Sequence, residues 1–86
     1  MDDMNSETEF TQQVASNVRS ALAADRKLIG DLAVVIGTTR STAGKRYRGL
    51  VPFELADIDK IAKWLGYQPR DFLSKEFRVR RSEVAA

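Results

Sequence analysis

The stretch LIGDLAVVIGTTRSTAGKRYRG, from Leu28 to Gly49, decides how this chain folds. Its first half places apolar side chains at the spacing of one buried helical face: Leu28, Ile29, Leu32, Ala33 and Ile36. Gly37 follows at once and suits the left-handed conformation that ends many helices, because it has no Cβ. Thr39 is placed to cap a second helix with its hydroxyl. The stretch therefore predicts two short helices, over about 26–36 and 40–48, joined by a tight turn.

The second of these helices is basic and poor in large apolar side chains. Residues 26–50 hold six basic and one acidic side chains, a net charge of +5, whereas residues 1–25 hold one basic and five acidic, a net charge of −4. The positive charge thus coincides with the helix pair, where a surface that follows DNA phosphates needs it. The alternative is an ordinary solvated face. An apolar helix, a glycine turn and a basic helix are together typical of a DNA-reading helix-turn-helix.

Several segments resemble the lambdoid phage repressor and Cro family. Residues 32–33 (Leu-Ala) and 36–39 (Ile-Gly-Thr-Thr) are similar to its helix-turn-helix signature. Residues 61–66 (Ile-Ala-Lys-Trp-Leu-Gly) and 69–73 (Pro-Arg-Asp-Phe-Leu) resemble its fourth and fifth helices. The resemblance covers about 14–73. It implies an all-α, five-helix DNA-binding domain in which the second and third helices form the helix-turn-helix.

The helix over 40–48 carries the candidate contacts to base edges, which are Arg40, Ser41 and Lys45. Arg40 offers a guanidinium to guanine N7 and O6, Ser41 donates or accepts, and Lys45 lies about one turn further along the same side. The resemblance places these three and Thr39 at positions that often contact bases or nearby backbone. The candidate contacts to DNA phosphates are Lys27, Thr39, Arg46 and Arg48.

The same helix also departs from the family pattern. Ala43 and Arg46 stand where larger apolar residues are usual, and Gly44 lies inside the helix. Ala43 and Tyr47, four positions apart, are expected to face the core. Gly44 weakens a short helix, and one functional account is a close approach of its backbone to DNA. The alternative is a tolerated weak helix that orders fully only on binding.

The rest of the domain, taken as residues 6–74, is predicted to be scaffold. Residues 1–5 are expected to be flexible, Ser6 to cap a helix over about 7–24, and Asp25 to cap the next helix. The first helix is expected to bury Phe10, Val14, Val18, Ala21 and Leu22. A helix over about 53–65 is expected to bury Leu55, Ile58, Ile61, Ala62 and Leu65. A short helix begins at Pro69. Asp57 and Asp59 are interpreted as surface charges.

The tail, residues 75–86, alternates apolar and basic side chains. This period predicts a short β-strand in which Phe77 and Val79 are candidate dimer contacts. The alternative is a flexible basic arm of Arg78, Arg80 and Arg81 on DNA. Because the chain has little room for a separate oligomerisation domain, a homodimer is expected to be weak or to form on DNA. The last three residues, Val-Ala-Ala, resemble C-terminal degradation tags, with a frayed end as the alternative.

Composition argues against an enzyme. The 86 residues include no Cys and no His, which removes disulfides, thiolate ligands and the commonest general base. Residues 37–45 have the wrong spacing for a phosphate-binding loop, and no metal-ligand spacing is visible, so no cofactor or metal is expected. No apolar run approaches the roughly 20 residues of a membrane span, and the acidic start is unlike a signal peptide. A cytoplasmic protein without a membrane partner is expected.

The sequence thus favours a regulator that binds double-stranded operator DNA, most similar to a phage Cro or immunity repressor. One alternative is an antitoxin-like DNA-binding protein whose main partner is a toxin protein. Another is a protein-interaction module that uses the same fold without DNA.

Overall fold

The computed structural model describes residues 2–79, with side chains for residues 8–79, and the regular secondary structure of these residues is entirely helical. The α-helices are α1 (Asp2–Ala24), α2 (Ile29–Ile36), α3 (Arg40–Tyr47) and α4 (Leu55–Leu65), followed by a 3₁₀-helix, η1 (Pro69–Leu73). The predicted all-α class is confirmed. The fifth helix expected from the sequence is this 3₁₀ segment, not an α-helix. No helix in the described part is long and apolar enough to cross a membrane.

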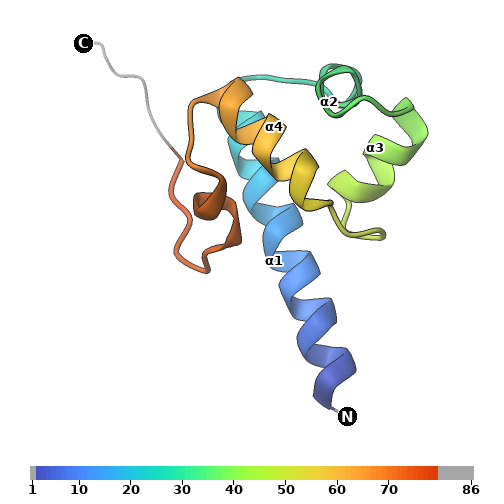
Figure 1. Cartoon of the computed structure of the whole chain (residues 1–86), viewed down its shortest axis with the longest axis vertical. Coiled ribbons are helices and arrows are strands. Elements are labelled where there is room, and N and C mark those ends of the chain that lie inside the picture. The colour runs from blue at the N-terminus through green and yellow to red at the C-terminus, as the bar shows by residue number, and fades with distance from the viewer. Residues whose placement is uncertain (1, 80–86) are drawn as a thin grey trace.

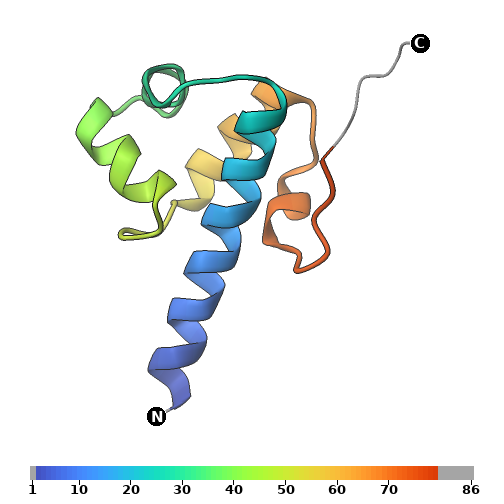
Figure 2. The ribbon, with the colours of Figure 1, turned by 180° about the vertical axis from the view of Figure 1, so that it is seen from behind.

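The helices surround one apolar core. Helices α2 and α3 lie on one side of the molecule and η1 on the other, with α1 and α4 between them (Figure 1). Helix α2 packs against α3 and α4, and η1 packs against α1 and α4. The largest fully buried side chains come from four of the five elements: Val18, Leu22, Leu32, Ile61 and Phe72. The N-terminal turns of α1 project beyond the rest of the molecule (Figure 2).

Three helices begin in the same way, with an aspartate in the first turn. The carboxylates of Asp31, Asp57 and Asp71 accept hydrogen bonds of 2.9 Å from the backbone N–H groups of Leu28, Glu54 and Gln68. Each bond satisfies the N–H of the residue that precedes the helix, and each negative charge is favourable at the positive helix end. Helix α2 therefore begins at Ile29, capped through Asp31, and the expected cap at Asp25 is wrong.

The end of α1 also explains the late start of α2. Arg26 adopts φ 57°, in the left-handed region, and the N–H of Lys27 donates to the carbonyl of Leu22 at 2.8 Å. This bond closes α1 in the way that a C-terminal glycine usually does. Residues 25–28 form a loop as a result. The predicted end of α2 is confirmed, because Gly37 adopts φ 72°.

The predicted starts of α1 and α4, and the predicted burial of Phe10 and Leu55, also need correction. Helix α1 begins at Asp2, so residues 2–5 are helical and Ser6 lies inside the helix. The expected core positions of α1 are buried except Phe10, which is 52% exposed. Helix α4 begins at Leu55, not Phe53, and the Leu55 side chain is 78% exposed. Phe10, in the N-terminal half of α1, and Leu55, in the first turn of α4, extend past the elements that would cover them.

The expected β-strand in the tail is absent from the described residues. Residues 77–79 have no regular secondary structure. The ring of Phe77 lies 5.1 Å from that of Phe72 and 5.4 Å from that of Tyr67, centroid to centroid. Phe77 is therefore packed against the core of its own chain. The predicted basic-arm residues Arg80 and Arg81, and the final Val-Ala-Ala, lie outside the described residues.

Candidate nucleic-acid interface

The outward face of α3 presents most of the side chains predicted to contact DNA. Arg40, Ser41, Lys45 and Arg48 are all exposed. Lys45 lies four positions after Ser41 and three before Arg48, and Arg40 lies eight positions, about two turns, before Arg48, so the four side chains share one side of the helix. Thr39 caps α3 as expected, because its Oγ1 accepts a hydrogen bond of 3.1 Å from a backbone N–H in the first turn.

Gly44 lies in the middle of this outward face. It is buried, although Arg40, Ser41, Lys45 and Arg48 on the same face are exposed. The cover is the side chain of Arg48, whose Nη1 would lie 3.3 Å from a Cβ added at Gly44. An exposed and flexible side chain thus shields a point where the helix backbone has no side chain of its own. If Arg48 swings away, the backbone of α3 is open to a close approach at that point.

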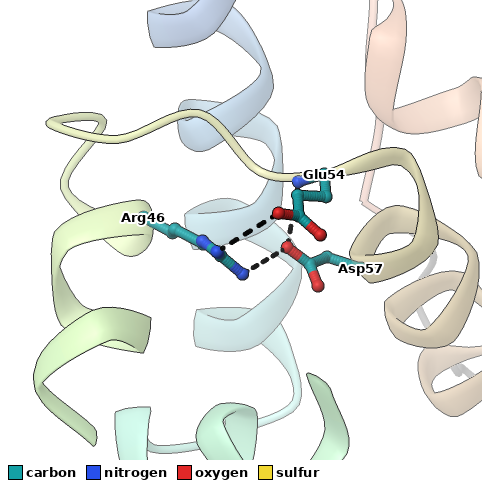
Figure 3. Close-up of polar contacts among 3 residues, drawn as sticks. All are labelled: Arg46, Glu54 and Asp57. Carbon is teal, nitrogen blue, oxygen red and sulfur yellow. Dashed lines mark hydrogen bonds and ion pairs between the residues drawn. The ribbon is translucent and has the colours of Figure 1, made fainter. Parts of the chain in front are cut away.

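Arg46 has a different role from the predicted phosphate contact. Its Nη1 lies 2.7 Å from Oδ2 of Asp57, and its Nη2 lies 3.7 Å from Oε2 of Glu54 (Figure 3). The side chains of Arg46 and Asp57 are only 16% and 5% exposed. The charge of Arg46 is therefore compensated inside the molecule. Asp57, interpreted from the sequence as a surface charge, is the buried partner.

This ion pair also explains how an arginine is accommodated at position 46, which lies largely inside the molecule. A basic residue at a largely inward position is tolerated only if its charge is paired and hydrogen-bonded. The same Asp57 oxygen accepts the N–H of Glu54 at 2.9 Å, so it joins α3 to the start of α4. An arginine flanked by the inward-facing Ala43 and Tyr47 was a sequence signal that an acidic partner is needed.

Two side chains of α1 hold the end of α3. Arg19 Nη1 donates to the carbonyl of Tyr47 at 2.9 Å, and Gln12 Nε2 donates to the carbonyl of Gly49 at 2.8 Å. The last carbonyls of a helix lack partners within the helix, so these donors satisfy groups that would otherwise need water. Gly49 adopts φ 81° at this turn. Sequence periodicity did not single out either contact, because it does not show which polar side chains reach across to another helix.

Lys27 lies in the loop before α2 and not in the first helical turn. Its Nζ is 5.5 Å from the centroid of the Trp64 ring, so the ammonium lies over an aromatic face. Such an interaction attracts the cation without neutralising it. Lys27 therefore keeps its positive charge while its stem is held against the body of the molecule.

The electrostatic character of the interface follows from these pairings. Residues 32–53 contain four basic and no acidic side chains. Arg46 is paired, whereas Arg40, Lys45 and Arg48 have no ion pair within residues 8–79. Guanidinium and ammonium groups are hydrogen-bond donors only, and the hydroxyls of Thr39 and Ser41 can act as either donor or acceptor. This surface suits a ligand rich in anionic and acceptor oxygens.

Comparison with protein-family models, with characterised proteins and with solved structures finds no match to this chain. The basis for a functional assignment is therefore the set of side chains on α3 and the contacts that hold this helix.

Proposed function

We propose that the chain is a transcriptional regulator that binds double-stranded DNA in a sequence-specific way, in the manner of a phage Cro or immunity repressor. One observation carries the proposal. The outward face of α3 exposes three cations, Arg40, Lys45 and Arg48, that have no acidic partner in the described part of the chain. The fourth cation of α3, Arg46, is paired inside the molecule.

In this proposal α2, the turn at Gly37 and α3 act as a helix-turn-helix. Helix α3 enters the major groove, where Arg40, Ser41 and Lys45 contact base edges. Thr39 and Arg48 contact phosphates from the ends of α3, and Lys27 does so from the loop before α2. Binding of the chain to an operator then excludes the polymerase from the promoter.

Gly44 fits the same mechanism. A residue without a side chain on the groove-facing side lets the backbone of α3 come closer to DNA than any other residue would. Arg48, which covers Gly44 in the unbound chain, is long enough to leave it for a phosphate. When Arg48 moves from Gly44 to a phosphate, it uncovers the backbone of α3 and brings its own positive charge next to the DNA backbone.

The test is selection of bound fragments from random duplex DNA, followed by affinity measurements for the selected and a scrambled sequence at two salt concentrations. The selected sequence is expected to bind on the order of a thousandfold more tightly than the scrambled one. Arg40→Ala is expected to weaken binding of the selected sequence by about 10- to 100-fold and to relax the preference for one base pair. Lys60→Ala, which removes an exposed cation of α4, is the matched control and is expected to change affinity little.

Each other outcome has a definite meaning. Equal and steeply salt-dependent binding of both sequences would leave only attraction to the phosphate backbone, which contradicts specific regulation. Absence of binding at low salt would overturn the proposal altogether. It would favour an antitoxin-like or protein-interaction role, in which the outward cations of α3 contact a protein.

A further inference from the structure

Gly44 forms a gap in the row of long side chains on the outward face of α3. Arg40 and Arg48 lie four positions before and after it, so one long side chain stands on each side of the gap along the helix. A Cβ built at Gly44 would have the Arg48 guanidinium as its nearest neighbour, with Nη1 at 3.3 Å and both Cζ and Nη2 at 3.9 Å. The gap is therefore closed by the end of a flexible side chain, and it opens when Arg48 turns toward a phosphate.

The surface inside the gap is apolar. The carbonyl of Gly44 accepts the N–H of Arg48 at 3.0 Å, and the N–H of Gly44 belongs to the hydrogen-bond pattern of the helix. Both polar groups of Gly44 are thus occupied, and its α-carbon presents C–H bonds alone. A base edge that placed a nitrogen or oxygen in the gap would lose its bond to water without gaining another. A ligand gains there only by van der Waals contact with an apolar group.

The major groove of unmodified DNA offers one such group. Guanine, adenine and cytosine present nitrogen and oxygen acceptors or amino donors there, whereas thymine adds a C5-methyl group beside its oxygen. The exposed donors of Arg40 and Lys45 suit the acceptors of guanine. The gap therefore adds a second kind of preference, for an apolar group, that the cations of α3 do not supply.

We propose that Gly44 is a specificity-determining residue, and that its gap receives the C5-methyl group of one thymine in the operator. The inference rests on the proposed function, because it requires α3 to lie in the major groove. Gly44 lies four residues after Arg40, about 6 Å along the helix axis, and base pairs are about 3.4 Å apart. The thymine is therefore expected within about two base pairs of the pair that Arg40 contacts.

Replacement of single thymines by deoxyuridine tests the proposal, because deoxyuridine lacks only the methyl group. The probe is the duplex selected from random DNA, and its affinity for the whole chain is measured by fluorescence anisotropy. Replacement of the thymine that faces Gly44 is expected to weaken binding about three- to fivefold, the effect of exposing one methyl-sized group. Gly44→Ala fills the gap with its own methyl group, and is expected to remove the preference for thymine over deoxyuridine at that position. Only the end of Arg48 must move, so this variant is expected to fold.

Two control variants make the test specific to Gly44. Gly30→Ala adds the same methyl group to α2, where nothing lies within 4 Å of the new Cβ, and is expected to keep the thymine preference. Arg40→Ala locates the base pair that Arg40 contacts, and is expected to weaken binding of the thymine and deoxyuridine duplexes alike. Specific binding without a methyl-dependent thymine within about two base pairs of that position, or a preference that Gly44→Ala retains, would overturn this inference and leave the proposed function intact. Failure to select any sequence would overturn both.

Discussion

Replacing Asp57 with alanine is expected to lower the free energy of unfolding by about 3 to 4 kcal/mol. The substitution leaves the guanidinium of Arg46 unpaired at a site where its side chain is only 16% exposed. Removal of one partner from a buried ion pair typically costs about 3–5 kcal/mol. The remaining exposure of Arg46 lets water reach part of the group, which favours the lower end. Loss of the acceptor for the Glu54 N–H adds to the cost.

A double-mutant cycle separates the charge from the helix cap. Asp57→Asn keeps a side-chain oxygen for the Glu54 N–H but removes the negative charge. Arg46→Met removes the positive charge and keeps much of the stem volume. Each single variant leaves one buried charge or polar group without its partner, whereas the double variant leaves no buried charge. The double variant is therefore expected to be more stable than the sum of the two single losses, by about 2 kcal/mol.

Urea unfolding followed by far-ultraviolet circular dichroism measures these free energies. The control is the Lys63–Asp59 pair on α4, with an N–O distance of 3.1 Å and side chains that are 76% and 48% exposed. Lys63→Met is expected to cost at most about 0.5 kcal/mol, because an exposed pair of this spacing contributes little. If Asp57→Ala costs no more than Lys63→Met, or if the cycle is additive, the Arg46–Asp57 pair does not hold α3 as inferred.

Three further substitutions test the local structure of α3, each by urea unfolding. Thr39→Ala removes the N-terminal cap and is expected to cost about 1 kcal/mol. Gly44→Ala is expected to stabilise the fold by up to about 1 kcal/mol, because only the flexible end of Arg48 must move, and yet to weaken DNA binding in a gel-shift assay. Gly49→Ala is expected to cost more than about 1 kcal/mol, because φ is 81° and the new Cβ would lie 2.5 Å from the Gln12 amide nitrogen.

The sequence predicted which helices form more accurately than it predicted where they begin and end. Apolar periodicity placed α1, α2 and α4, and the chemistry of single residues placed the end of α2 at Gly37 and the start of α3 at its cap, Thr39. The start of α2 was wrong, because Arg26 takes a left-handed conformation that sequence rules assign to glycine. That one residue turns residues 25–28 into a loop and moves Lys27 out of the helix.

The contacts between helices were predicted less well than the helices themselves. Periodicity shows which face of a helix is apolar, but it does not show which polar side chains on two helices will meet. Asp57 therefore gave no sign that it is buried, and Arg46 was predicted to contact a phosphate, whereas it pairs with this acid. For the same reason the exposure of Leu55 was not foreseen, since the stripe on α4 extends one turn beyond the elements that cover it.

The two ends of α3 are held in different ways, and this difference bears on the proposed function. The C-terminal end is fixed from α1 by Arg19 and Gln12 and from α4 by Asp57, all through hydrogen bonds of 2.7–2.9 Å. The N-terminal end depends on its own cap at Thr39 and on the turn at Gly37. Exposed side chains at the freer end, Arg40 above all, can adjust to a ligand while the opposite end keeps the helix at one angle. A recognition helix needs one fixed end and side chains at the other end that can adjust, because specificity depends on placing a few donors accurately while the rest of the helix stays in register.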